Sequence, residues 1–283
     1  MQRASPTCSE ENARELNKEA FKLIENEGKL LTKYKNYWQS RNLPNPGIIL
    51  CHEYGLGNIM CGDGSVLDVY YIALEFLGIG HLLSVFNACR ELFKNMSFLA
   101  TFMEYLLCAT KFIHTLGDAH LDLKFDNILI GLPINGRFRI RISDFGGSQT
   151  KDGDGYIIRS THTEKYAPPE LRSHLSESGI GPEQYSGEKV DVHCLGTILY
   201  GLLTGEFPYQ FPLLIHNYDT LIFGALKGQH IFFKTMVYHM LHPNSTVRCT
   251  LDQAIDMFAR VPGKMSQENF YLVLNKYFSI LPK

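Results

Sequence analysis

One stretch of the chain, the octapeptide HLDLKFDN at residues 120–127, constrains the fold and the chemistry more than any other. It brings a carboxylate (Asp122), an ammonium group (Lys124) and an amide (Asn127) into one short loop, between an apolar-periodic segment at 93–114 and a short apolar strand. Phosphoryl transfer needs a carboxylate to orient a hydroxyl, a cation near the moving phosphate and an oxygen ligand for Mg²⁺. The stretch therefore predicts a helix, a phosphotransfer loop and a strand, in that order.

A hairpin is predicted directly after this loop. Asn135-Gly136 stands between an apolar run and the alternating residues 137–142, which is the strongest short-range hairpin signal. With these two residues as the turn, Asn127 lies opposite Asp144, at ~4.5–5.5 Å between Cβ atoms. Two such oxygen ligands suit Mg²⁺ when phosphates complete its coordination shell. A solvated hairpin end is the alternative interpretation of the same pair.

The next residues, Asp144-Phe145-Gly146, make a resemblance specific. The order H-L-D-L-K-F-D-N, hairpin, D-F-G resembles the catalytic centre of the eukaryotic-type protein kinase family. The likeness continues to the PPE sequence that ends at Glu170, where the family has A-P-E, and to the DVHCLG sequence that begins at Asp191. It covers roughly residues 120–210, with weaker likeness on both sides.

This resemblance implies an α+β, protein-kinase-like two-lobe fold. It divides the chain into a truncated N-terminal lobe at 1–76, made of a helix and two strands, and a mainly helical C-terminal lobe at 77–283. The helix is expected over residues 11–38, with a possible break at Gly28. The two strands are expected at 48–50 and 69–74.

The glycines between these strands, in the sequence GLGNIMCG at 55–62, suggest a phosphate-binding loop at first sight. The third glycine is misplaced, however, because Met60 occupies its position. A flexible connection between the two strands is the preferred interpretation.

The resemblance assigns the nucleotide site to the segment between the lobes. Leu74 closes the back of the pocket, and Glu75 and Leu77 belong to the hinge whose backbone binds the adenine edge. Leu129 lies under the adenine ring. These residues imply ATP as the nucleotide, with Mg²⁺ as its metal ion.

The family also has a glutamate on its first helix that pairs with a strand lysine. Glu27 matches that position best, and Glu19 and Glu25 are rivals. His120 is expected to pack under Phe145 of the D-F-G motif.

Further roles follow from the same resemblance. Lys124 and Thr163 stand at positions typical of Ser/Thr rather than Tyr specificity. Asp191 is expected to cap the backbone of the catalytic loop, and Arg248 to form a largely buried ion pair with Glu170.

Bulk properties narrow the functional classes. With 45% hydrophobic and 20% charged residues the 283-residue chain can bury a core, and its net charge of −2 argues against nucleic-acid binding. Seven scattered cysteines without a C-x-x-C motif indicate reduced thiols. No secretory signal is recognised, and Glu104 and Lys111 interrupt the most apolar run, so no membrane span is expected. We expect a cytoplasmic monomer.

Three functional hypotheses result. The first is a Ser/Thr protein kinase, in which Asp122 orients a hydroxyl of a protein substrate, Lys124 steadies the γ-phosphate, and Asn127 and Asp144 hold Mg²⁺. The second is a catalytically weak pseudokinase that acts as a binding scaffold, since neither G-x-G-x-x-G nor a strand lysine stands in the 26 residues before Glu27. The third is phosphotransfer to a small molecule, against which the PPE and DVHCLG sequences speak.

Overall fold

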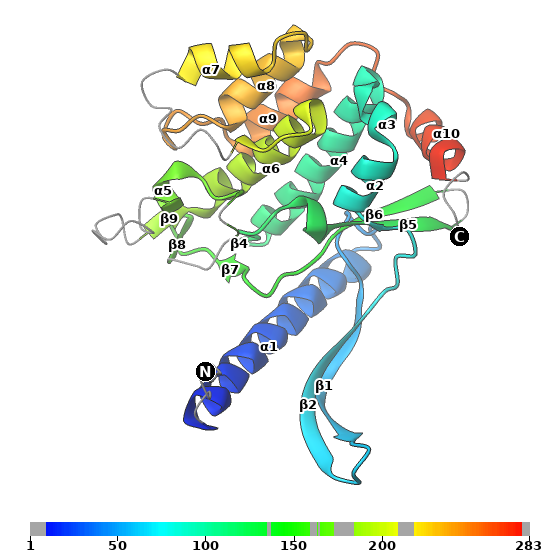
Figure 1. The fold of residues 1–283 in the computed structure, drawn as a ribbon, viewed down its shortest axis with the longest axis vertical. Coiled ribbons are helices and arrows are strands. Elements are labelled where there is room, and N and C mark those ends of the chain that lie inside the picture. The colour runs from blue at the N-terminus through cyan, green and yellow to red at the C-terminus, as the bar shows by residue number, and fades with distance from the viewer. Residues whose placement is uncertain are drawn as a thin grey trace, which may run out of the picture.

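A computed structural model describes residues 10–134, 137–158, 163, 165–172, 184–208 and 218–278. A helical body carries a small sheet on one side, and one long helix and a long hairpin project from that side (Figure 1). The helices are α1 (Glu10–Ser40), α2 (Leu82–Ala88), α3 (Arg90–Lys94), α4 (Met96–Thr115), the short 3-10 turn η1 (Phe125–Asn127), α5 (Pro169–Arg172), α6 (Gly187–Thr204), α7 (Tyr218–Ala225), α8 (Ile231–Met240), α9 (Leu251–Ala259) and α10 (Gln267–Phe278).

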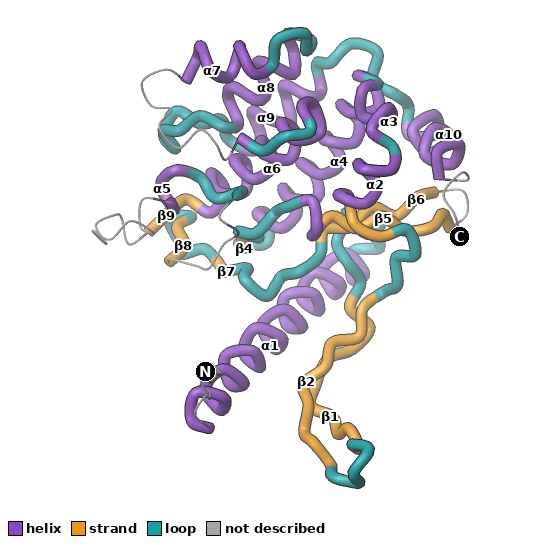
Figure 2. The backbone as a smooth tube through the Cα atoms, in the orientation of Figure 1, coloured by secondary structure: helices purple, strands orange, loops and turns teal. Residues whose placement is uncertain are grey.

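Within the described residues, the strands form four small antiparallel sheets (Figure 2). The order is β1–β2, β3–β5–β6, β4–β7 and β8–β9. Their bounds are β1 (Cys51–Met60), β2 (Val66–Leu74), β3 (Gly80–His81), β4 (Asp118–Ala119), β5 (Ile128–Ile134), β6 (Arg137–Ile142), β7 (Gln149–Thr150), β8 (Tyr156–Ile158) and β9 (Gln184–Ser186).

Helix α1 runs unbroken past Gly28, so the break considered at this residue does not occur. The ring of Tyr54, from β1, lies directly against this glycine: a Cβ atom there would be 2.3 Å from the Tyr54 Cγ. The C-terminal half of α1 buries Leu31, Tyr34 and Trp38 against the body. Glycine is thus used where the hairpin approaches the helix closely, and its weak helix propensity is tolerated because the helix is packed on one side.

The hairpin of β1 and β2 is longer than predicted. Its strands pair from Met60 opposite Val66 to Cys51 opposite Leu74, with one irregularity between Cys51 and Glu53, so Gly55 and Gly57 of the predicted flexible connection lie inside a strand. The reason is a cross-strand contact: the ring of Tyr71 covers the position where a Cβ of Gly57 would stand, at 3.3 Å. The predicted strand at 48–50 is reduced to an isolated bridge between Ile48 and Ile142.

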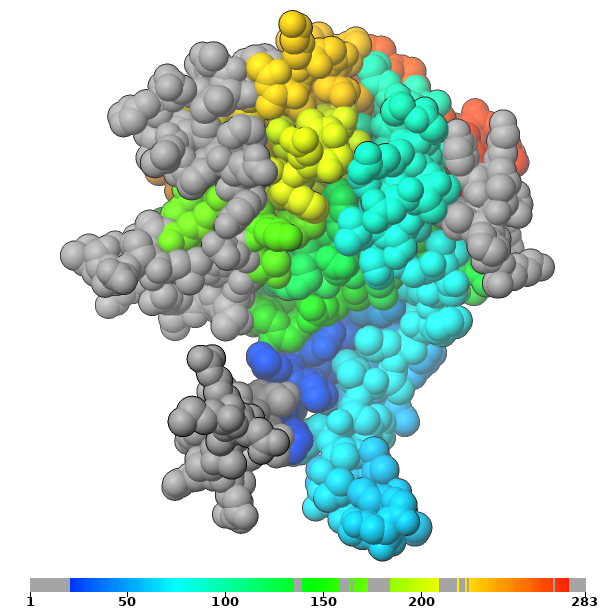
Figure 3. All heavy atoms as spheres, viewed as in Figure 1, coloured from blue at the N-terminus to red at the C-terminus, as the bar shows by residue number. Residues whose placement is uncertain are grey.

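The distal end of this hairpin stands clear of the helical body (Figure 3). Its large apolar side chains are exposed there: Leu56, Ile59, Met60, Val66 and Leu67. A two-stranded ribbon by itself is only marginally stable, so the body and α1 must support its proximal half.

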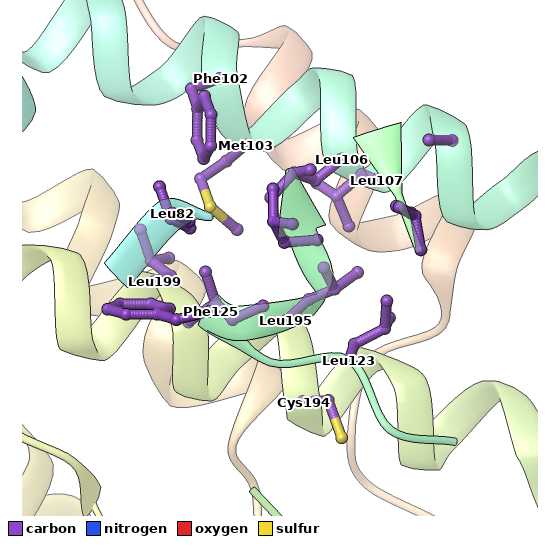
Figure 4. Close-up of a cluster of buried hydrophobic side chains, with 14 of the residues drawn as sticks. Leu82, Phe102, Met103, Leu106, Leu107, Leu123, Phe125, Cys194, Leu195 and Leu199 are labelled. Carbon is purple, nitrogen blue, oxygen red and sulfur yellow. The ribbon is translucent and has the colours of Figure 1, made fainter. Parts of the chain in front are cut away.

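The core of the body lies between α4 and α6. Figure 4 shows apolar side chains from both helices closing around residues of the catalytic loop, and each labelled residue is buried: Leu82, Phe102, Met103, Leu106, Leu107, Leu123, Phe125, Cys194, Leu195 and Leu199. Burying one such Leu or Phe side chain contributes ~1.5–3 kcal/mol. The loop therefore rests on buried apolar side chains of both helices.

Helix α4 begins later than predicted. Asn95 separates it from α3, and the Asn95 side chain accepts a hydrogen bond from the Phe98 amide as an N-cap. Among the described residues, α4 is also the one helix long and apolar enough to cross a membrane, yet more than half of that stretch is buried in the structure. Core helices of soluble proteins pass the same test.

The β5–β6 hairpin has a different register from the one predicted. The paired residues are Ile128 and Ile142, Leu129 and Arg141, Ile130 and Ile140, Gly131 and Arg139, and Ile134 and Arg137. Strand β5 thus contains one extra residue between Gly131 and Ile134. Pro133 lies in this bulge, where its missing N–H costs no ladder hydrogen bond. The predicted turn at 135–136 lies outside the described residues.

This bulge corrects the predicted opposition of Asn127 and Asp144. Asn127 faces Ser143 instead, and the Ser143 amide donates to the Asn127 carbonyl at 2.9 Å. Asp144 is the next residue along the chain and adopts a left-handed backbone conformation, with φ at 65°. The two proposed metal ligands therefore come from adjacent rungs rather than from one cross-strand pair.

Candidate active site

The loop after β4 gathers the predicted polar residues. The Lys124 Nζ lies 2.5 Å from Oδ2 of Asp122 and 3.1 Å from Oγ1 of Thr163, while the Thr163 amide donates to Oδ1 of Asp122 at 3.1 Å. The Asn127 Nδ2 donates to the Asp122 carbonyl at 2.9 Å. A carboxylate and an ammonium group thus meet a hydroxyl from the segment after D-F-G, and all three residues are partly exposed.

Asp191, near the start of α6, binds the backbone of this loop. Its carboxylate accepts from the amides of His120 at 2.8 Å and Leu121 at 2.7 Å, and lies 2.7 Å from Nε2 of His114. Burial acts to raise the pKa of the Asp191 carboxyl group. The bonds from His114 and from the His120 amide lower it by more, so the pKa lies below its usual value. Leu121 has φ at 70°, a strained conformation for a bulky residue, which the surrounding bonds maintain.

His120 joins the loop to the strand before D-F-G. Its Nε2 lies 3.0 Å from the Ser143 carbonyl, and its Nδ1 accepts from the Asp122 amide at 3.3 Å. These two bonds require a neutral ring with its proton on Nε2. The ring meets Phe145 edge to face at 4.7 Å between centroids, which is the packing that the sequence predicted.

Asp144 and Asn127 are the residues that can hold a metal ion. Asn127 is buried and uses its Nδ2 for the loop, which leaves its amide oxygen as the ligand atom, and Asp144 is exposed. One amide and one carboxylate oxygen fit Mg²⁺, which binds few protein ligands when phosphates supply others. Among the described residues, no group of three or more His, Cys, Asp or Glu residues could hold a metal by itself.

Glu27 from α1 reaches the D-F-G motif. Its Oε1 accepts from the Phe145 amide at 3.0 Å. Burial raises the pKa of Glu27, the bond from this amide opposes the rise, and the charge of Asp144 adds to it. Of the two rivals, Glu25 pairs with Lys29 at the helix surface, and the side chain of Glu19 lies outside the described residues. The Glu27 carboxylate binds a main-chain amide, where the resemblance implied a strand lysine.

The hinge is tied to β6 through Glu75. Its Oε1 lies 2.7 Å from Nε of Arg141 and accepts from the Leu50 amide at 3.0 Å, while its Oε2 lies 2.8 Å from Nη1 of Arg139. Arg139 also donates to the Phe76 carbonyl at 3.3 Å. No motif in the sequence assigns a role to either arginine, although the alternation at 137–142 places both on one face of the strand.

The apolar residues assigned to the nucleotide pocket lie around this hinge. Leu77 is buried and packs on Gly131, where a Cβ atom would come within 2.3 Å of its Cδ2. Leu129, on the same strand as Gly131, pairs with His81 of β3. Leu74, at the end of β2, is partly buried against the core. The three leucines thus border the link between the hairpin and the body.

Arg248 and Glu170 form the expected ion pair. The Arg248 Nη1 and Nη2 lie 2.7 and 2.9 Å from the two carboxylate oxygens of Glu170, a two-pronged contact. Arg248 also donates to the carbonyls of Lys189 at 2.8 Å and His242 at 3.0 Å. The pair therefore connects α5 with α6 and with the turn before α9.

His193, in the middle of α6, makes stability dependent on pH. Its Nδ1 lies 3.1 Å from the Tyr166 carbonyl, so this nitrogen carries the proton. Burial, with the charges of Arg248 and Arg172, lowers the pKa of His193 well below its usual value. The unfolded chain takes up this proton near pH 6.5 while the folded chain does not. The contribution of His193 to the free energy of unfolding is therefore fully present above pH ~6.5 and is lost as the pH falls below that value.

We expect the free energy of unfolding to fall by up to ~1.4 kcal/mol per pH unit below pH ~6.5 because of His193. The replacement His193→Asn keeps a donor for the Tyr166 carbonyl and cannot titrate, so its slope should be smaller. Urea unfolding at several pH values between about 7.5 and 5 measures both slopes. Equal slopes for the two proteins would contradict the assignment.

The fold and these side chains define the phosphotransfer class: a loop carboxylate and lysine, an amide and a carboxylate for a metal ion, and a hinge beside them. Comparison with known families gives the same result. The sequence model of the family described as "Protein kinase domain" matches residues 65–258. The chain belongs to the protein kinase family, and the α+β kinase fold that the sequence predicted is confirmed.

Two curated plant proteins illustrate the similarity. "CBL-interacting protein kinase 5" of Oryza sativa subsp. japonica is 28% identical over 222 residues, which are 76% of this chain and 43% of that protein. "CBL-interacting serine/threonine-protein kinase 20" of Arabidopsis thaliana is also 28% identical over 222 residues, which are 76% of this chain and 45% of that protein. The matched region thus spans less than half the length of each relative.

Proposed function

We propose that the protein is a Ser/Thr protein kinase, which transfers the γ-phosphate of ATP to a hydroxyl of a protein substrate. The observation that carries this proposal is the contact of Lys124 with both Asp122 and Thr163. The contact draws the segment after D-F-G onto the catalytic loop, where an acceptor peptide must lie. The printed name of one relative, a serine/threonine-protein kinase, supports the choice of acceptor.

Each residue then has a defined task. Asp122 orients the acceptor hydroxyl, and Lys124 neutralises charge on the γ-phosphate as it moves. Asn127 and Asp144 hold Mg²⁺, which supplies the remaining charge stabilisation when it is bound with ATP. The backbone at Glu75 and Leu77 binds the adenine edge, with Leu74 behind the ring and Leu129 under it.

The proposal includes an arrangement and a location. The two strands and α1, up to residue 76, form the smaller lobe, and the helices from 77 onward form the larger one. The six described cysteines are free thiols, which fits a reducing, intracellular compartment. We propose that the protein acts there as a monomer.

A binding scaffold with weak catalysis is the second candidate. The bond between Glu27 and the Phe145 amide favours it. In an active kinase that glutamate pairs with the lysine that holds the nucleotide phosphates. A glutamate already occupied by a main-chain amide offers less to such a lysine.

Metal binding tests the proposal. We expect Mn²⁺, as a probe of the Mg²⁺ site, to bind well only together with ATP, because two protein oxygens alone make a weak site. Asp144→Asn should weaken Mn²⁺ binding in the presence of ATP by about tenfold or more. The exposed Asp154 provides a matched control, since Asp154→Asn should change nothing. Equal Mn²⁺ binding by the parent chain and Asp144→Asn, both with ATP, would refute the proposed site.

A further inference from the structure

Polar contacts attach α1 to the chain segments that carry the catalytic residues. In Figure 1 the helix passes beside the part of the body that contains β4 and β7. The side-chain amide of Asn26 donates to the Ser148 carbonyl at 3.1 Å, and the Glu27 carboxylate accepts from the main-chain amide of Phe145 at 3.0 Å. The third contact joins the Lys33 ammonium group to the Asp118 carboxylate at 2.6 Å. None of the roles described above involves this ion pair of Lys33 and Asp118.

Lys33 compensates a carboxylate that is removed from water. The Asp118 side chain is 0% exposed, whereas the Lys33 side chain is 42% exposed. Lys33 also donates to the carbonyl of Leu116, the residue at the C-terminal end of α4, at 2.8 Å. Thr150 donates to the other oxygen of Asp118 at 2.8 Å. A buried carboxylate is tolerated only with such partners, so the position of Lys33 is closely defined.

Asp118 lies where the two catalytic segments meet. It belongs to β4, which leads directly into His120, and it pairs with Thr150 of β7, which follows D-F-G. One ion pair from α1 therefore acts on both segments. Burial and the neighbouring Asp118 charge raise the pKa of Tyr34, whose ring also meets Phe145 edge to face at 5.5 Å.

The helix transmits the position of Lys33 to Glu27. Both residues lie in one unbroken helix, less than two turns apart, so a shift at one end of this segment moves the other. Glu27 in turn holds the amide that follows Asp144. Helix α1 thus contacts the backbone directly after Asp144.

We propose that Lys33 is a positioning residue: its ion pair with Asp118 holds α1 where Glu27 binds the Phe145 amide, and so places Asp144 for the metal–nucleotide complex. The inference rests on the proposed function for its last step only. In this arrangement the ion pair of Lys33 and Asp118, neither of which binds nucleotide, fixes α1 and the D-F-G motif relative to each other.

Two measurements on Lys33→Met test the proposal. We expect hydrogen exchange at the Phe145 amide to become faster, and Mn²⁺–ATP binding weaker, each by roughly two- to thirty-fold. Lys33→Arg can still reach both Asp118 and the Leu116 carbonyl and should restore both values. Lys29→Met, which removes an exposed partner of Glu25 on the same helix, is the matched control and should match the parent chain.

Asp118→Asn keeps the test decisive if Lys33→Met fails to fold. It removes the charge pair without leaving a buried charge, because Lys33 can turn to solvent. Faster exchange at Phe145 in this variant, with amides in α6 unchanged, supports the proposal, because a general loss of stability would affect both. Parent-like exchange at Phe145 in a folded Lys33→Met or Asp118→Asn overturns it. If the parent chain binds no Mn²⁺–ATP, the proposed function fails, but the exchange experiment still decides the role of Lys33.

Discussion

Replacing Arg248 by alanine should lower the free energy of unfolding by ~3–5 kcal/mol. Arg248 is 1% exposed, and its guanidinium group contacts both oxygens of Glu170 as well as two main-chain carbonyls. Removing it takes this donor away from the Glu170 carboxylate and from two main-chain carbonyls, and it also leaves a cavity. Thermal and urea unfolding of the variant measure the loss.

An exposed ion pair supplies the control for this prediction. Lys94 and Glu91 are both 71% exposed on their side chains and 2.5 Å apart. Lys94→Ala should change the free energy of unfolding by less than ~1 kcal/mol, because exposed pairs contribute little. If Arg248→Ala melts as close to the parent chain as Lys94→Ala does, the Glu170–Arg248 contact does not stabilise the fold.

Asp122→Asn should reduce phosphate transfer by ~10²–10⁴-fold, with little effect on nucleotide binding. The amide keeps the shape of the side chain and can still accept from the Thr163 amide, but it cannot act as a base or carry the charge that pairs with Lys124. Release of phosphate from Mg²⁺–ATP and autophosphorylation both measure the loss without a known protein substrate.

Asp126→Asn is the matched control, since Asp126 stands in the same loop with its side chain 52% exposed and 3.9 Å from Nδ1 of His81. Phosphate release from this variant should equal that of the parent chain.

We also expect the parent chain to turn over slowly. Glu27 binds the Phe145 amide, and a phosphate misplaced by about 1 Å can lower the rate of transfer ~10²-fold. Fast turnover that survives Asp122→Asn would exclude Asp122 as the catalytic residue.

Local patterns in the sequence predicted which polar residues of the catalytic loop lie close together. Asp122, Lys124 and Asn127 lie close in the chain, so any loop that joins a buried helix to a buried strand must present them together. The apolar run in α6 predicted a helix buried on most sides, and that burial is what allows Asp191 to reach the amides of His120 and Leu121.

The features that the sequence did not predict depend on contacts between distant residues or on a single inserted residue. One extra residue between Gly131 and Ile134 shifts the register of β5, and Pro133 within this interval is a sign of a bulge in the sequence. Gly57 is predicted to lie in a flexible connection, because no pattern in the sequence indicates that the Tyr71 ring of β2 covers it. The partner of Lys33 lies 85 residues away, and neither helical periodicity nor a motif indicates it.

The backbone of Leu121 has a consequence for how the molecule forms. A leucine adopts a left-handed conformation only against its local preference, and here the carboxylate that binds its amide comes from α6, 70 residues later. The conformation of the loop thus depends on a contact that exists only when α6 is packed beside it. We therefore expect helical content to return during refolding before the loop is in place, which far-UV circular dichroism and nucleotide binding, followed over time, would separate.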